Sequence, residues 1–150
     1  MRQSLNQKEC ATLLADNYIG YLGYISKNSP FIVPITYFFD GKKTIIIYCS
    51  EGDKINAMRK NNNVSLQVSE IKDIDNWNSV LAHGNFEELS GIDAKHNLHQ
   101  FANGIKNIIL TKEEVNLYFI GEFSSKINKE EIPIVGKITI YELTGKTRIN

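Results

Sequence analysis

The sequence predicts one mainly β domain over residues 1–150, in which about six antiparallel strands close into a β-barrel with a few short helices. Three observations predict this fold class. Several apolar runs alternate with a period of two, as strands do, and few recur at helical spacing. Turn signals containing Gly, Asn and Asp separate these runs at short intervals. A chain of 150 residues also suits one domain with a single core.

The predicted strands account for most of the chain. They lie at residues 18–25, 31–39, 44–48, 64–68, 79–89 and 136–141. Asp40-Gly41, between the second and third of them, predicts a hairpin turn. Most of the strands are therefore expected to be joined by hairpins in an antiparallel sheet.

Short helices are expected between the strands. They lie at residues 6–16, at 54–60, from 93 onward and near 115–119, and the polar stretch 123–132 predicts a loop. Capping patterns precede three of these helices, at Ser4-x-x-Gln7, Ser90-x-x-Asp93 and Thr111-x-x-Glu114. The helix at 54–60 is expected to stop at Asn61-Asn62-Asn63.

Composition and charge exclude several function classes. Seventeen basic residues balance seventeen acidic ones, which gives no electrostatic reason to expect nucleic acid or an anionic membrane as the main partner. No apolar run is long enough to span a membrane, and the N-terminus has no apolar signal core. Cys10 and Cys49 form neither a disulfide framework nor a metal spacing, so reduced thiols and a cytoplasmic location are expected.

The segment from Ser50 to Lys54 is the best candidate for binding a phosphate. It follows an apolar strand and precedes a helix, whose first N–H groups favour an anion. Ser50 offers a hydroxyl, Gly52 lets the backbone approach closely, and Lys54 offers a positive charge. The segment lacks the full phosphate-loop and dinucleotide glycine patterns, so its position in the chain carries the argument. Cys49 before it is interpreted as a buried thiol rather than a nucleophile.

Pro34 interrupts an otherwise regular strand and has two interpretations. Proline cannot donate to a ladder, so this strand is either a plain edge or the place where a flat ligand lies against the backbone. Trp77 is either a core residue or a pocket residue beside Ser79. The three histidines, His83, His96 and His99, are interpreted as surface or interface groups, and no metal site is predicted.

These residues, in this order, resemble the pyridoxamine 5'-phosphate oxidase-like flavoproteins, nearest the nitroimidazole-resistance and flavin-nucleotide-binding group. The resemblance rests on four motifs: Val33-Pro34-Ile35-Thr36-Tyr37, Tyr48-Cys49-Ser50 with Gly52-Asp53-Lys54, Trp77-Asn78-Ser79-Val80 with Gly84 and Glu87-Glu88-Leu89, and Thr144-Gly145-Lys146. It covers most of the chain except residues 104–133.

The resemblance implies an antiparallel Greek-key split barrel that binds flavin mononucleotide (FMN) at a homodimer interface. Ser50, Gly52 and Lys54 would hold the phosphate, and the flavin would carry the redox chemistry. The ring would lie against residues 33–36 and be approached by Ser79 and Val80. The implied cofactor-binding residues are Val33, Pro34, Ile35, Thr36, Tyr48, Cys49, Ser50, Gly52, Lys54, Trp77, Ser79 and Val80.

Two departures from the family pattern narrow the function. Cys49 stands where nitroimidazole-resistance proteins commonly have histidine, which argues against a nitroimidazole reductase. Residues 31–37 contain no arginine or lysine and residues 144–150 no histidine, which argues against oxidation of vitamin B6. The resulting hypothesis is an FMN-dependent oxidoreductase with a small-molecule acceptor and no assigned catalytic residue. The alternatives are a flavin- or haem-binding module without turnover, and an interaction domain with an empty barrel.

Overall fold

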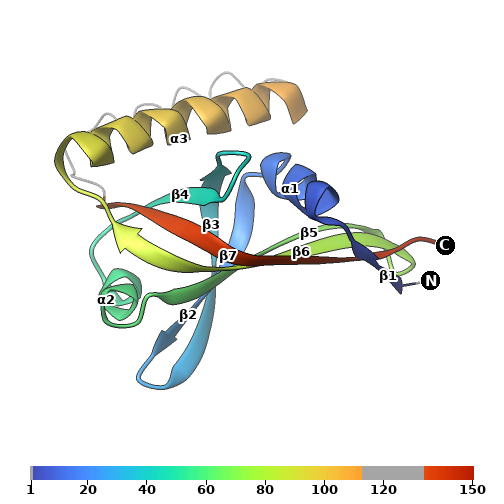
Figure 1. Ribbon diagram of the computed structural model, residues 1–150, viewed down its shortest axis with the longest axis horizontal. Coiled ribbons are helices and arrows are strands. Elements are labelled where there is room, and N and C mark those ends of the chain that lie inside the picture. The colour runs from blue at the N-terminus through green and yellow to red at the C-terminus, as the bar shows by residue number, and fades with distance from the viewer. Residues whose placement is uncertain (1, 113–133) are drawn as a thin grey trace.

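A computed structural model describes residues 2–112 and 134–150, which form a seven-stranded antiparallel sheet and three helices (Figure 1). The elements in chain order are β1 (Arg2–Leu5), α1 (Gln7–Ala15), β2 (Ile19–Ser26), β3 (Ser29–Phe39), β4 (Thr44–Cys49), α2 (Asp53–Lys60), β5 (Asn63–Asp73), β6 (Asn76–Glu88), α3 (Gly91–Lys112) and β7 (Ile134–Arg148). Each of the six predicted strands is present, most of them longer than predicted.

The sheet closes into a barrel. Its strand order is β1-β7-β4-β3-β2-β5-β6, and β6 also pairs with β7. Strands β2, β3 and β4 are consecutive antiparallel neighbours, and β5 returns to lie beside β2, which is the Greek-key order. The first part of β7 lies between β4 and β6, and its last part lies between β1 and β6. The predicted antiparallel barrel is therefore confirmed.

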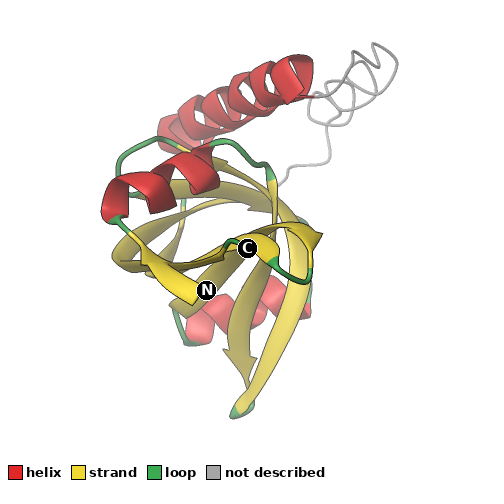
Figure 2. Cartoon of the chain, turned by 90° about the vertical axis from the view of Figure 1, so that its right-hand side faces the viewer, coloured by secondary structure: helices red, strands yellow, loops and turns green. Residues whose placement is uncertain are grey.

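The N-terminal strand β1 was not predicted. The segment 2–5 is short and mostly polar, and it becomes a strand because it pairs with the C-terminal end of β7. The two termini consequently lie side by side (Figures 1 and 2). The predicted cap of the first helix is also wrong, because Ser4 belongs to this strand. Asn6 and Glu9 form the capping box instead, with Asn6 Oδ1 accepting from the Glu9 N–H at 2.8 Å.

The main core fills the barrel. Inward-facing residues alternate along each strand, as Ile35, Tyr37 and Phe39 do along β3. Helices α1 and α2 add apolar side chains to the same core, from Cys10, Leu13 and Leu14 and from Ile55, Ala57 and Met58. The buried hydroxyl of Tyr37 donates to the carbonyl of Leu14 at 2.7 Å, which ties β3 to the end of α1. Burial raises the pKa of Tyr37, so this hydroxyl keeps its proton.

Helix α3 builds a second core on the outside of the barrel. Its Phe101, Ile105 and Ile109 pack on Ile46 of β4 and Val135 of β7. Figure 2 shows α3 crossing one side of the strands, with α2 on the opposite side. None of the helices described is long and apolar enough to cross a bilayer.

The third helix is longer than the sequence predicted. It runs through Thr111, which was expected to cap a separate helix and instead donates its hydroxyl to the Asn107 carbonyl at 2.8 Å. That capping prediction is wrong, because burial of every third or fourth residue against the sheet continues the helix. The helix predicted near 115–119 and the loop predicted at 123–132 lie outside the described residues.

Gly104 lets α3 approach the sheet closely. A Cβ atom at this position would lie 2.1 Å from the ring of Phe38. An exposed Gly→Ala change within a helix is expected to stabilise by about 1 kcal/mol, because alanine is the better helix former. At Gly104 the clash with Phe38 is expected to reverse this effect, so that alanine destabilises the protein.

We predict that Gly104→Ala lowers the free energy of unfolding by about 1–3 kcal/mol, because the added methyl group overpacks the contact with Phe38. Urea unfolding followed by circular dichroism measures the change. The matched control is Asn103→Ala, an exposed neighbour on the same helix, which should change stability little. A Gly104→Ala protein more stable than the wild type would contradict the packing described.

Candidate functional site

Strand β3 changes partners part-way along its length. Its residues 29–36 pair with β2, whereas only Tyr37, Phe38 and Phe39 pair with β4. Along its other side β4 pairs with β7 over Thr44–Cys49, so its last two residues, Tyr48 and Cys49, pair with β7 but not with β3. Within residues 2–112 and 134–150, the side of β3 facing away from β2 therefore has no strand partner over residues 29–36. We call this stretch the open edge.

Pro34 lies on the open edge with its nitrogen on the unpaired side. The Tyr37 N–H donates to the Tyr18 carbonyl at 2.8 Å, so it points toward β2. Backbone groups of successive residues point to opposite sides of a strand, which directs the nitrogen of Pro34 away from β2. Proline therefore costs no hydrogen bond to β2, and its predicted edge position is confirmed. The backbone groups of Ile32 and Thr36 point the same way and present donors and acceptors along the edge.

The side chains along this stretch alternate between two faces. Val33 and Ile35 pack toward the barrel core, whereas Pro34 is exposed and Thr36 is half-buried on the outer face. A flat ligand at the open edge would thus meet backbone groups in its own plane.

The predicted phosphate segment begins where β4 has left β3. Ser50 comes three residues after Ile47, the last β4 residue that pairs with β3. Gly52 is the N-cap of α2, and no side chain accepts a hydrogen bond from the first turn of this helix. The helix therefore starts with N–H groups that no cap satisfies, which is an arrangement that favours an anion.

Lys54 and Ser50 are the side chains at this helix start that could bind an anion, whereas Glu51 and Asp53 are acidic. Lys54 is half-buried, and among the described residues its ammonium group makes no hydrogen bond and no ion pair. Ser50 is exposed. A cation that pairs with no carboxylate of the described chain is available to a bound phosphate.

Arg59, on the last turn of α2, was not singled out from the sequence. Its guanidinium binds both oxygens of Glu51, at 3.0 and 3.2 Å, and donates to Glu88 of β6 at 2.6 Å. These hydrogen bonds, first that of Glu88 and then that of Glu51, raise the pKa of Arg59. The bond from Arg59 also lowers the pKa of Glu88. Nothing in the local sequence revealed this residue, because Glu88 reaches it from a distant strand.

The two residues before the phosphate segment pack on opposite sides of β4. Cys49 is 6% exposed within the barrel core, and burial raises the pKa of its thiol although the nearby Lys54 ammonium opposes the shift. The predicted burial of this thiol is therefore confirmed. Tyr48 faces outward, where its ring meets Phe101 of α3 edge to face at 5.0 Å. Both side chains are held in packed surroundings.

The remaining predicted residues, Trp77, Ser79 and Val80, lie at the other end of β6. Trp77 is eleven positions before Glu88, a path of about 36 Å along an extended strand. Val80 is buried in the barrel core, and Ser79 Oγ accepts from the Gln67 side chain at 2.8 Å on the outer face. Since Glu88 is the β6 residue that meets α2, the structure separates these residues from the phosphate segment of the same chain.

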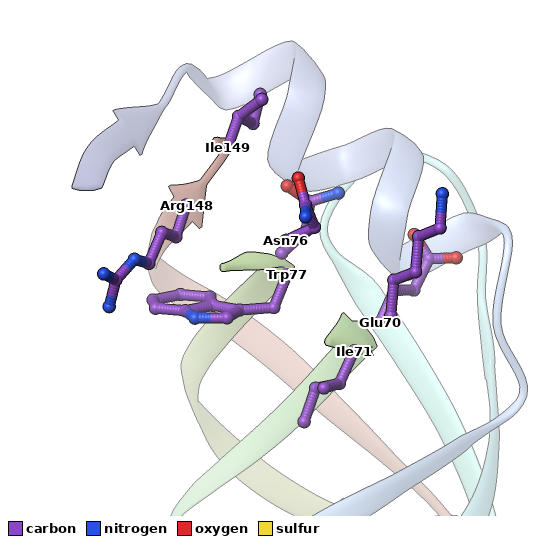
Figure 3. Close-up of a pocket in the computed structure, with 8 residues that line it drawn as sticks. Glu70, Ile71, Asn76, Trp77, Arg148 and Ile149 are labelled. Atoms are coloured by element: carbon purple, nitrogen blue, oxygen red, sulfur yellow. The ribbon is translucent and has the colours of Figure 1, made fainter. Parts of the chain in front are cut away.

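Trp77 lines an open pocket of about 550 Å³ at this far end (Figure 3). Arg148 of β7 lies beside it and pairs with Asp75 at 3.1 Å. The exposed side chains of Ile71 and Ile149 form the apolar part of the wall. The pocket thus combines an aromatic and apolar wall with the charged side chains of Glu70, Lys72 and Arg148, and it is distant from Lys54.

The histidines lie apart from these sites. His83 is on the outer face of β6, where its Nδ1 and the hydroxyl of Ser65 are 2.7 Å apart. His96 and His99 are exposed on α3, as predicted. In the part of the chain that the structure describes, no three His, Cys, Asp or Glu residues lie together in a way that could hold a metal ion.

Comparisons with known proteins agree with this fold. The family model of pyridoxamine 5'-phosphate oxidase matches residues 6–146. An uncharacterized protein of Rhizobium meliloti (strain 1021) is 34% identical over 94 residues, which cover 61% of this chain and 60% of that protein.

Solved structures are similar over nearly the whole chain. A FAD-binding protein from Mesorhizobium loti is 25% identical, with a TM-score of 0.75 and 98% of each chain covered. A protein from Bacteroides thetaiotaomicron named for 5-nitroimidazole antibiotic resistance is 17% identical, with a TM-score of 0.69, and the match covers 98% of this chain and 89% of that one. These matches confirm the split-barrel fold that the sequence motifs implied.

Proposed function

This chain belongs to the pyridoxamine 5'-phosphate oxidase family, and on that premise we propose that it is an FMN-binding oxidoreductase that passes electrons to a small acceptor. When bound, the flavin supplies the redox chemistry. The chain's own residues bind it, orient its ring and cover part of its surface. Its proposed location is cytoplasmic.

One observation supports the proposal: the uncapped start of α2 and the open edge of β3 both lie just past the last residue pair between β3 and β4. The last pair between β3 and β4 is Tyr37 with Ile47, and both parts of the site lie just beyond it. Lys54, Ser50 and the first N–H groups of α2 would bind the phosphate. The backbone of residues 32–36 would bind the polar edge of the ring, in place of the missing strand.

We propose FMN rather than FAD because the segment offers one available cation. Arg59 is occupied by Glu51 and Glu88, which leaves Lys54 for a single phosphate. A diphosphate would need to balance a second charged group in a segment that also carries Glu51 and Asp53, and among the described residues of this segment no second unpaired cation is present. The similar protein from Mesorhizobium loti is named as FAD-binding, so titration with both flavins decides between FMN and FAD.

Lys54→Ala is predicted to weaken FMN binding about ten- to a hundredfold and riboflavin binding little, because only FMN carries the phosphate. Titrations followed by flavin fluorescence measure both ligands. The control is Lys60→Ala at the exposed end of the same helix, which should leave both affinities unchanged. Equal losses for FMN and riboflavin would rule out a phosphate role for Lys54.

A homodimer with the flavin at its interface is the second part of the proposal. The Trp77 end of β6 cannot reach the phosphate segment of its own chain, whereas a second copy could bring its Trp77 and Ser79 to that segment. A surface suited to such a contact lies beside the open edge. Ile19, Tyr21 and Ile32 on the outer face of β2 and β3 are 55%, 52% and 72% exposed.

Dimerisation is predicted to depend on this outer face. Ile32→Asp should shift the protein to a monomer, because burying an unpaired carboxylate in an apolar contact is costly. Added FMN should strengthen the wild-type dimer, since a ligand that bridges two subunits favours the assembled state. Light scattering measures the mass in each case. Ile92→Asp on α3 is the control for an exposed isoleucine elsewhere. A wild-type protein that is monomeric when loaded with flavin would contradict the proposed homodimer.

Redox activity is tested by absorbance. The purified protein is predicted to show flavin bands that bleach without oxygen when a reduced nicotinamide is added, and that return with an electron acceptor. Flavin bands that no nicotinamide donor bleaches would instead support a carrier without turnover. A Soret band would support the haem-binding alternative, and a colourless protein that FMN cannot titrate would reject both.

A further inference from the structure

We infer that Arg59 is a positioning residue for the phosphate site, which holds the Glu51 carboxylate away from the bound anion and fixes the segment before α2 to the end of β6. This inference rests on the proposed FMN site. It adds a residue to which neither the sequence motifs nor the comparisons assign a role.

The contacts of Arg59 join three parts of the structure. Nη2 and Nη1 bind the two carboxylate oxygens of Glu51 at 3.0 and 3.2 Å. Nε donates to Glu88 of β6 at 2.6 Å, and Nη1 also donates to Asn56 Oδ1, one turn earlier on α2, at 3.1 Å. A planar guanidinium can satisfy all of these partners at once, whereas an ammonium group cannot form the same bidentate pair.

The location of Glu51 explains why such a restraint matters. Glu51 lies between Ser50 and Gly52, inside the proposed phosphate segment, and three residues before Lys54. A carboxylate free to turn toward the helix start would repel the phosphate and compete for the ammonium group of Lys54. In the structure both of its oxygens are directed to Arg59 instead.

Because Arg59 binds Glu88 as well as Glu51, it fixes the position of the segment that contains Glu51. Exposed ion pairs contribute little to global stability, so stability alone does not account for a guanidinium with this many partners. Glu88 ends β6, whereas Glu51 belongs to the connection between β4 and α2. Arg59 therefore fixes the approach to α2 against a strand that is remote in sequence, and it holds both carboxylates with one positive charge.

The test compares FMN and riboflavin binding in Arg59→Ala and in Arg59→Ala combined with Glu51→Gln. Releasing Glu51 should weaken FMN by about three- to tenfold, as expected for one like charge nearby, and leave riboflavin almost unchanged. Removing that charge with Glu51→Gln should restore most of the FMN affinity. The loss in Arg59→Ala should also shrink at high salt, which screens the repulsion.

A merely structural role gives a different pattern. If Arg59→Ala weakens FMN and riboflavin equally, or if Glu51→Gln restores nothing, the inference is overturned. If the alanine variant does not fold, Arg59→Lys is measured with and without Glu51→Gln. The same FMN-specific loss and the same restoration by Glu51→Gln are then required. The proposed function fails separately, if wild-type protein binds no flavin or Lys54→Ala shows no FMN-specific loss. An FMN-specific loss in Lys54→Ala without one in Arg59→Ala rejects only the role of Arg59.

Discussion

The short pairing of β4 with β3 is the constraint on which the rest of the structure depends. Along one side β4 pairs with β7 over Thr44–Cys49, but along its other side only Ile45, Ile46 and Ile47 pair with β3. Among the described residues, this short pairing leaves one side of β3 without a strand partner over residues 29–36. An unpaired edge is normally a liability for aggregation, and the proposed flavin and second copy would cover it here.

The electrostatics of the proposed phosphate site follow from the same short pairing of β4 with β3. The chain leaves the sheet at Ser50 and enters α2 at Asp53, so the helix starts shortly after the last β4 residue that pairs with β3. Two carboxylates, those of Glu51 and Asp53, flank this start and would weaken an anion site. The structure directs Glu51 to Arg59 and leaves Lys54 without a hydrogen-bond or ion-pair partner among the described residues, so one cation remains available at this helix start.

Much of the site could be predicted from short-range patterns. Pro34 in a strand, and Gly52 and Lys54 before a helix, are local signals whose meaning depends on the few residues around them, and in the structure each lies beyond the last pair between β3 and β4, Tyr37 with Ile47. The role of Arg59 could not be predicted, because its partner Glu88 is 29 residues away in the chain. The separation of Trp77 from Lys54 also required the register of β6, which no motif specifies.

The sequence by itself determined the strands, the hairpin at Asp40-Gly41 and the barrel class, because alternation and turn chemistry act over a few residues. It did not determine that residues 2–5 form a strand, since their pairing with β7 is a contact between the two ends of the chain. Nor did it determine that α3 continues through Thr111, where packing on the sheet outweighs a local capping pattern. Tertiary structure decided which strand edge stays open, because that depends on how many residues of β4 pair with β3, which no local pattern specifies.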